Sequence, residues 1–383
     1  MKFVFGKPVD EPFDREEEVG KLRTLILRGQ STSVIGVRRI GKTSILLKTL
    51  KEINLPKVYV NVEVFTEGKS VDLVAFLEYY SALILSETLR NLDPKARIPM
   101  ILRERGESVI NALRDMLGYM KISLNFRPMN VELFLNKGTN YKESVRELLD
   151  LPQLMAEKLR KRLVVVMDEF QYLRLAEQNY PGLFHLLRSK WQFHKDVVYV
   201  VSGSSVGLLE RMFSSGEEPF YQFFFPIYVK PFDRGVSLRF LKSGLEDEGK
   251  KYSEEALAKA VDELDGIPAW LNYFGLETLG CEAVEQNCVA KTLERMYNDP
   301  VIVRMVEGEY NKLGKNAKLV ISFLARRGGM GNLRGVGLRK SSLMEGVNSL
   351  LREGYLTREG RGVYRIVDPV IAKVLRIRSA DVG

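Results

Sequence analysis

The sequence predicts an α/β fold with a parallel sheet at its core, followed by a helical region and a small basic domain. Three observations carry this prediction. Apolar, β-branched runs alternate with helical patterns over about the first 230 residues, as in parallel sheets, whose connections need crossover helices. Helical patterns dominate from about residue 234 to 310, and a basic segment with a hairpin pattern follows.

The core is predicted to hold five strands. Continuous apolar runs favour strands that are buried on both faces. The predicted strands are residues 31–36, 57–65, 162–170, 197–203 and 223–232.

Two segments connect the early strands. Residues 42–53 carry apolar side chains at helical spacing and predict an amphipathic helix. The tract from about 66 to 160 is longer than a crossover needs, and within it residues 121–126 and 130–135 alternate like a small hairpin. We therefore predict an insertion there.

Three domains follow from this pattern: a core at 1–233, a helical lid at 234–310 and a C-terminal domain at 311–383. The last is predicted to contain helices at about 315–327 and 341–353, joined by a Gly-rich turn region, and then two strands within 354–368. Helix, turn, helix and hairpin is the order of a winged helix. Gly335 and Gly337, however, sit where the first helix of the helix-turn-helix pair should be.

Residues 36–43, GVRRIGKT, match the phosphate-binding pattern G-x-x-x-x-G-K-[ST]. Glycines let backbone N–H groups close around phosphate, the lysine reaches the β- and γ-phosphates, and the hydroxyl binds Mg²⁺. A predicted strand precedes the motif and a predicted helix follows it, as this chemistry requires. The residues predicted to bind the nucleotide are Gly36, Val37, Arg38, Arg39, Ile40, Gly41, Lys42, Thr43 and Ser44.

A second motif ends the strand at 162–170, where Asp168 and Glu169 follow five apolar residues. Asp168 is the predicted partner of Thr43 in holding Mg²⁺, and Glu169 the predicted base that orients and deprotonates the attacking water. Adjacent acids can also simply favour a helix N-terminus, but the upstream Gly-Lys-Thr favours the catalytic interpretation.

The stretch GSSVG at 203–207 fits G-x-S-x-G, the strand-to-helix turn that exposes the nucleophile of α/β-hydrolases. In that fold the histidine follows the serine. Here both histidines, His185 and His194, precede Ser205. The order of residues therefore disfavours a serine hydrolase.

Five segments, EPFDREEEVGKL, GVRRIGKTSIL, VVVMDEFQYL, VVSGSSVGLLE and DGIPAWL, occur in this order. Together they resemble the archaeal ATPase family of the STAND class of P-loop NTPases, relatives of AAA+ proteins. The resemblance runs from about residue 10 to 375 and implies a P-loop NTPase core, a helical lid and a C-terminal winged helix. It also implies ATP and Mg²⁺ as ligands.

The resemblance assigns further residues to the site. It places Phe13 and Arg15 near the adenine and brings Pro268 of the lid to the base. Ser204 or Ser205 takes the sensor 1 role beside the γ-phosphate. Phe13 could equally be a core anchor, and Pro268 could equally start a helix. The family's candidate arginine finger has no counterpart, since no arginine lies between Arg211 and Arg234.

The charge is concentrated at the C-terminal end. Residues 311–383 hold 15 Lys and Arg against 5 Asp and Glu, while the rest of the chain is nearly neutral. In a winged helix such charge favours contact with duplex DNA, although winged helices also serve as protein-binding or autoinhibitory modules. The predicted DNA-contacting residues are Arg339, Lys340, Ser342, Arg358 and Arg361, the last two flanking a wing turn at 359–360.

Composition disfavours three classes of protein: disulfide-rich, zinc-binding and membrane-spanning proteins. Cys281 and Cys288 are too few for a disulfide framework or a zinc site, and the best apolar stretch, residues 71–89, contains Glu78 and Glu87. We therefore expect a cytoplasmic protein that does not enter a membrane. The sequence leaves self-association open.

The sequence thus predicts an ATP-binding and ATP-hydrolysing switch that couples its Mg-ATP state to a DNA-binding winged helix. The alternative is a nucleotide-gated DNA- or protein-binding regulator with negligible hydrolysis. The missing arginine finger supports the alternative, since such a residue contributes several orders of magnitude to the rate.

Overall fold

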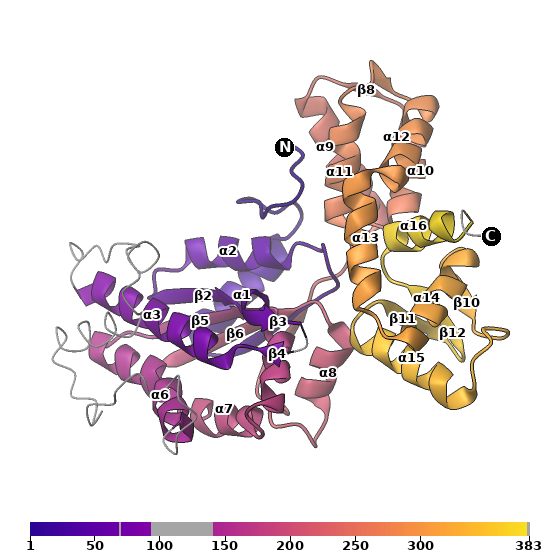
Figure 1. Ribbon diagram of the computed structural model, residues 1–383. Coiled ribbons are helices and arrows are strands. Elements are labelled where there is room, and N and C mark those ends of the chain that lie inside the picture. The colour runs from indigo at the N-terminus through magenta and orange to yellow at the C-terminus, as the bar shows by residue number, and fades with distance from the viewer. Residues whose placement is uncertain (69, 93–140, 381–383) are drawn as a thin grey trace.

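The computed structural model of the chain describes residues 1–68, 70–92 and 141–380. In Figure 1 the sheet and its helices lie at one end of the molecule, and the helical and C-terminal regions lie together at the other. The hairpin predicted at 121–126 and 130–135 falls outside the described residues.

A five-stranded parallel sheet forms the first part, as the sequence predicts. Its strand order is β2-β5-β6-β1-β7, and every residue of β5 and β6 is buried. The prediction for 57–65 was too long, because the strand ends at Asn61 and a 3-10 helix, η1 (Val62–Phe65), follows. The strands are β1 (Thr32–Ile35), β2 (Lys57–Asn61), β5 (Leu163–Asp168), β6 (Val197–Gly203) and β7 (Phe225–Tyr228).

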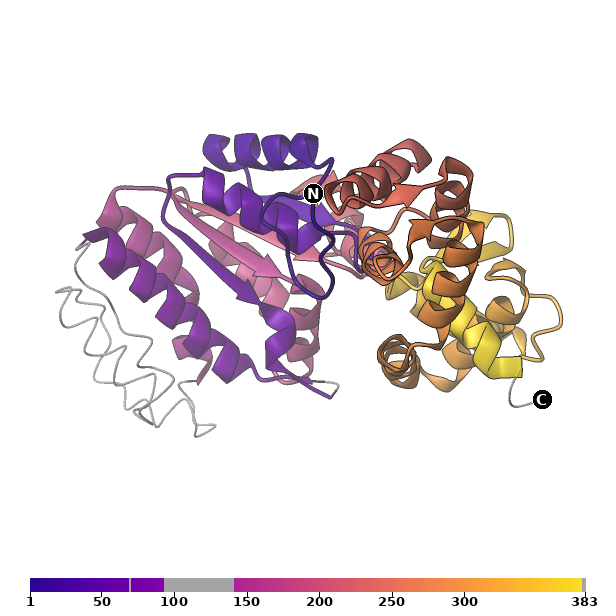
Figure 2. The same ribbon diagram turned by 90° about the horizontal axis from the view of Figure 1, so that it is seen from above.

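Helices cover both faces of the sheet, as Figure 2 shows from above. On one face the apolar side chains of α1 (Glu16–Arg28) and α2 (Lys42–Glu52) form one core with the sheet. On the other face a second core contains α3 (Leu73–Leu92), α6 (Tyr141–Leu159), α7 (Leu183–Trp191) and α8 (Val206–Ser214), together with the 3-10 helix η3 (Phe170–Gln178). Over the described ranges no helix has both the length and the apolar character to cross a membrane.

Helices dominate the next region, as predicted. They are α9 (Arg234–Asp247), α10 (Glu254–Leu264), α11 (Pro268–Thr278), α12 (Gln286–Asn298) and α13 (Pro300–Lys312). Two short parallel strands, β8 (Lys251–Tyr252) and β9 (Ala283–Val284), join their ends. Cys281 and Cys288 form a disulfide beside β9, which the count of cysteines alone did not lead us to expect.

The C-terminal region contains α14 (Lys315–Arg326), β10 (Met330–Asn332), α15 (Lys340–Arg352), β11 (Leu356–Gly360), β12 (Val363–Ile366) and α16 (Pro369–Ala380). Its antiparallel sheet has the order β10-β12-β11. Between β10 and α15 the chain forms turns rather than a helix, and Gly335 and Gly337 there have left-handed backbones, with φ of 85° and 77°. The hairpin turn was predicted at 359–360, but it lies at Arg361-Gly362 because β11 continues to Gly360.

Candidate functional site

The loop between β1 and α2 carries the Gly-Lys-Thr motif at the carboxyl edge of the sheet. Gly41 has φ of 93° and starts α2 at Lys42, and within the described part of the chain no side chain caps this helix. The N–H groups and dipole of an uncapped helix N-terminus favour an anion. The loop thus has the form that the motif predicts for phosphate binding.

Lys42 is buried at the base of this loop, with 6% of its side chain exposed. Its Nζ donates to the Val37 carbonyl at 3.1 Å and lies 3.9 Å from Oε1 of Glu169. Burial lowers the pKa of Lys42, while Glu169 and Asp168 oppose that shift. An anion bound beside Nζ would compensate for the lost hydration of this ammonium group.

Asp168 lies at the end of β5 and is 2% exposed. Its Oδ2 accepts from Thr43 Oγ1 at 2.9 Å and from the Tyr59 hydroxyl at 2.7 Å, and its Oδ1 accepts from Ser202 Oγ. Burial, followed by Asp168, raises the pKa of Tyr59, so this hydroxyl stays a donor. The structure brings Thr43 and Asp168 together, as predicted, and adds Tyr59 and Ser202, which the sequence analysis missed.

Glu169 follows with a left-handed backbone, φ 52°. Its Oε2 accepts from Ser204 Oγ at 2.8 Å and from Ser204 N at 3.2 Å, and the Gln171 amide also donates to it. Ser205 instead sits at the N-cap of α8. Of the two predicted sensor serines, the structure thus places Ser204 against Glu169.

Lys42, Thr43, Glu169 and Ser204 line one cavity of about 520 Å³, a volume in the usual range for small-molecule sites. The N-terminal segment, residues 4–9, forms a further wall that sequence reasoning missed. Val4 N donates to Asn272 Oδ1 at 2.7 Å, and Val9 N donates to Ser44 Oγ at 3.1 Å. Pro268, the first residue of α11, also lines the cavity, so the two interpretations of this proline are compatible.

The comparisons with known proteins agree with this geometry. A family model for an ATPase domain found predominantly in Archaea matches residues 13–274. The chain belongs to this family. The Walker-type ATPase PABY2304 of Pyrococcus abyssi is 25% identical over 98% of this chain and 99% of that chain, with a TM-score of 0.66. Family and fold together support an ATP-binding P-loop ATPase.

A more distant likeness extends to the ORC2 protein of Aeropyrum pernix, whose structure was solved in ADPNP-ADP complexes. It is 15% identical over 99% of this chain and 98% of that chain, with a TM-score of 0.53, which shows a shared fold. No curated protein matches the sequence.

Two residues predicted to lie near the adenine, Phe13 and Arg15, do not line this cavity. The Phe13 ring packs edge-on against Phe232 and Phe240, with centroids 6.2 and 5.3 Å away. Arg15 donates to the Lys230 carbonyl at 2.8 Å, and its guanidinium lies 4.5 Å from the centroid of the Phe232 ring. Both side chains therefore pack between the start of α1 and the start of α9.

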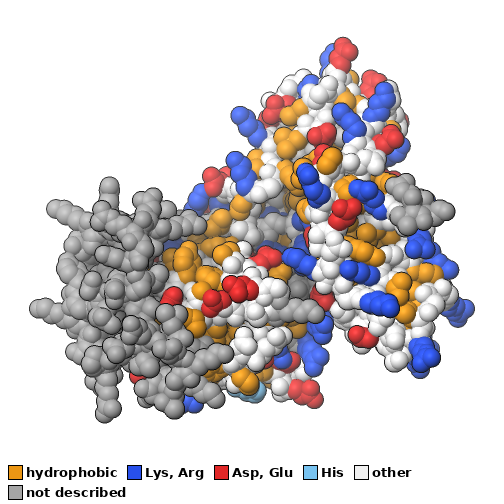
Figure 3. All heavy atoms as spheres, viewed as in Figure 1, with side chains coloured by type: hydrophobic (Ala, Val, Ile, Leu, Met, Phe, Trp, Pro, Cys, Tyr) orange, Lys and Arg blue, Asp and Glu red, His pale blue; other side chains and the backbone are white. Residues whose placement is uncertain are grey.

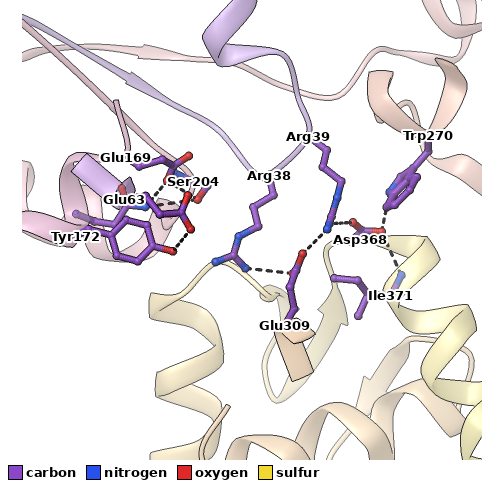
Figure 4. Close-up of polar contacts among 11 residues, drawn as sticks. Arg38, Arg39, Glu63, Glu169, Tyr172, Ser204, Trp270, Glu309, Asp368 and Ile371 are labelled. Atoms are coloured by element: carbon purple, nitrogen blue, oxygen red, sulfur yellow. Dashed lines mark hydrogen bonds and ion pairs between the residues drawn. The ribbon is translucent and has the colours of Figure 1, made fainter. Parts of the chain in front are cut away.

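Arg38 and Arg39 line the same cavity, but their side chains extend away from the Gly-Lys-Thr motif towards the C-terminal half of the ATPase (Figure 4). Arg39 bonds Asp368 at 2.7 Å and also pairs with Glu309. Arg38 lies 3.4 Å from Glu309, and its guanidinium is 4.7 Å from the centroid of the Tyr355 ring. The motif itself gave no sign of these contacts.

The residues predicted to contact DNA lie on the C-terminal region. Arg339, Lys340, Arg358 and Arg361 are exposed and Ser342 is half-buried. Figure 3 shows Lys and Arg side chains spread over this region on the face drawn. Arg358 also donates to the Tyr364 hydroxyl at 3.3 Å, while Arg361 lies in the hairpin turn itself.

Proposed function

We propose that the ATPase is a STAND-type switch, related to AAA+ proteins, that binds and hydrolyses Mg-ATP and transmits the nucleotide state to a DNA-binding winged helix. One observation carries this proposal. At the carboxyl edge of the sheet, Thr43 contacts Asp168 and Lys42 lies beside Glu169. The proposed units are the core at 1–233, the helical lid at 234–310 and the winged helix at 311–383.

The cavity suits a nucleoside triphosphate with its metal. The loop at 36–44 and the buried Lys42 would hold the phosphates. The hydroxyl of Thr43 and the carboxylate of Asp168 would hold Mg²⁺, a hard cation that prefers such oxygen ligands. The metal held there would supply positive charge against the negative charge that develops on the phosphates. Pro268 and residues 5–9 would enclose the rest of the nucleotide.

Glu169 is the proposed base for the attacking water. Its carboxylate lies beside Lys42 and is held by Ser204 from the neighbouring strand end. Ser204 would thus orient Glu169, which in turn orients the water. A serine that links the catalytic glutamate to the β6–α8 turn can report a change at the phosphate to that turn.

The winged-helix assignment is supported by the order α14, β10, α15, β11, β12 and by the hairpin between the last two strands. Arg339, the N-cap residue of α15, and Lys340, its first residue, are exposed to solvent. These residues and Arg361 suit phosphate contacts, which position the protein on DNA without reading its sequence.

The central experiment is ATP turnover measured with and without duplex DNA. We expect the wild type to release phosphate and Lys42→Ala to lose ATP binding. Glu169→Gln should bind ATP, but its turnover rate should fall by a factor of about 100 or more. Lys51→Ala, at a residue of the same helix whose side chain is 59% exposed, serves as the matched lysine control. A wild type that neither binds ATP nor loses turnover on Lys42→Ala contradicts the proposal.

The alternative is a regulator in which ATP is a ligand with negligible hydrolysis. Its support is that the sequence has no arginine between Arg211 and Arg234, where the family's finger is expected. Unchanged phosphate release on Glu169→Gln, with ATP still bound, would favour this regulator over the enzyme.

DNA binding is tested separately by its salt dependence. The double substitution Arg339→Ala with Lys340→Ala should weaken binding to duplex DNA of any sequence. It should also reduce the slope of log K against log salt by about 2. Lys251→Ala with Lys291→Ala removes two exposed charges from the helical region and should leave the slope unchanged. Equal effects of the two pairs would refute the proposed surface.

A further inference from the structure

A four-residue cluster joins the phosphate loop to the C-terminal half of the chain. We call Arg38, Arg39, Glu309 and Asp368 the latch (Figure 4). The side chains of Arg39, Glu309 and Asp368 are only 13%, 15% and 11% exposed. Water therefore screens these ion pairs less than it screens surface pairs.

The backbone of Arg39 is unusual. Its φ of 65° is left-handed, a conformation that costs free energy for any residue with a Cβ. A left-handed residue within such a loop turns successive N–H groups into one concave anion site. The shape that suits phosphate is thus strained at Arg39, and something outside the loop must stabilise it.

The carboxylate of Asp368 is positioned independently of Arg39. Oδ1 of Asp368 accepts from Trp270 Nε1 at 2.9 Å and caps α16 by accepting from Val370 N and Ile371 N at 2.9 and 3.2 Å. Oδ2 of the same carboxylate is left for the Arg39 guanidinium. Asp368 therefore fixes the arginine, not the reverse.

The other contacts of Arg39 act in the same direction. Its guanidinium lies 4.9 Å from the centroid of the Trp270 ring, and its carbonyl accepts from Ala269 N at 3.4 Å. Both partners belong to α11, so the side chain and backbone of Arg39 are both held from outside the loop.

The charges of the latch balance, with two guanidinium groups against two carboxylates. The intact latch therefore adds no net charge beside an incoming phosphate. Loss of one carboxylate would leave a net positive charge, which by itself favours phosphate, so weaker ATP binding in such a variant reports the geometry of the loop.

We propose that Glu309 and Asp368 are positioning residues that hold Arg39 in its left-handed conformation, so that docking of the helical and C-terminal regions keeps the phosphate-binding loop formed. This inference rests on the proposed function of the loop as a nucleotide site. Because linkage is reciprocal, bound ATP tightens the docking by the same factor as docking tightens ATP.

The test compares Asp368→Asn in two backgrounds, with the ATP dissociation constant measured by calorimetry. With Arg39 present, the substitution should weaken ATP binding about tenfold, or about 1.4 kcal/mol. With Arg39→Gly the same substitution should change affinity less than about twofold, because glycine adopts the left-handed conformation without the latch. A merely structural role for Asp368 would give equal losses in both backgrounds.

Glu309→Gln provides a second variant, since it leaves the cap of α16 intact, and it should follow the same pattern. Lys373→Gln is the control. It removes an ion pair to Glu263 at 3.4 Å, which joins the helical and C-terminal regions without involving the loop, and ATP affinity should not change.

The outcomes separate the inference from the proposed function. A wild type that fails to bind ATP overturns both. A wild type that binds ATP while Asp368→Asn and Glu309→Gln bind it equally well overturns the latch alone. Tighter ATP binding by these variants also overturns the latch as proposed. In that case Glu309 and Asp368 would be keeping the two arginines from binding phosphate.

Discussion

Gly354 offers a direct test of whether docking of the C-terminal region reaches the catalytic residues. It follows α15 with φ of 78°, and a Cβ at this position would lie 2.8 Å from the Ser204 carbonyl. Gly354→Ala therefore has two costs. The left-handed backbone costs about 1–2 kcal/mol, and the new methyl group forces α15 away from the β6–α8 turn.

Gly362→Ala isolates the first cost. Gly362 lies in the same region with φ of 74°, but a Cβ there meets nothing within 4 Å. Gly362→Ala should lose about 1–2 kcal/mol of stability in thermal unfolding, and Gly354→Ala should lose more, because it also has the steric cost. Only Gly354→Ala should also separate the two surfaces.

Hydrogen exchange and ATP turnover provide the assays. In Gly354→Ala we expect faster exchange of the amides at 204–209 and slower turnover, because Ser204 also bonds Glu169. Gly207→Ala alters the same contact from the side of the core, because its Cβ would lie 2.6 Å from the Leu351 carbonyl. It should likewise speed exchange of these amides and slow turnover. If Gly354→Ala and Gly362→Ala behave alike in exchange and turnover, the docking argument is wrong.

Three further predictions concern single side chains. Ser204→Ala should slow turnover while sparing ATP binding, and Ser205→Ala should do so much less, since only Ser204 bonds Glu169; equal rates would contradict the assignment. Burial lowers the pKa of His194 from 6.5, and Asp150 opposes this shift. Below about pH 6.5 the unfolded chain therefore binds the proton more readily, and stability falls as the pH drops towards the folded pKa. Urea unfolding of His194→Gln should show less of this loss than wild type, and the same pH dependence in both would refute it. Phe170→Ala removes a fully buried ring and should cost about 3–5 kcal/mol in chemical unfolding; a loss below about 1 kcal/mol would contradict its place in the core.

Local patterns predicted much of the core. The strands β1, β5 and β6 read as short apolar runs because helices cover both faces of the sheet. The carboxyl ends of all strands in a parallel sheet lie along one edge of that sheet. The pairing of Thr43 with Asp168 could therefore be expected from two motifs 125 residues apart.

Register and tertiary contacts explain what was missed. Tyr59 and Ser202 bond Asp168 because β2 and β6 flank β5. Their residue types carry no mark of that role, and only the strand order reveals it. The contact of Arg39 with Asp368 joins residues 329 apart, and no local pattern encodes so distant a partner.

The resemblance to relatives could not locate every side chain either. Arg15 was expected near the base, yet its guanidinium is used against Phe232 and the Lys230 carbonyl. The spacing of Cys281 and Cys288 permits a bond, but whether it forms depends on how the chain turns at β9.

The N-terminal segment has a consequence for how the molecule can move. Phe3 is buried among residues of α9 and α11, while Val9 is bonded to Ser44 on α2. The chain thus crosses between the sheet and the helical region twice, once at residues 4–9 and once at 229–233. Two covalent crossings leave one easy degree of freedom, a rotation about the line that joins them. The cavity should therefore open by rotation of the helical region about this line. The two crossings restrict translation of the helical region and its rotation about other axes.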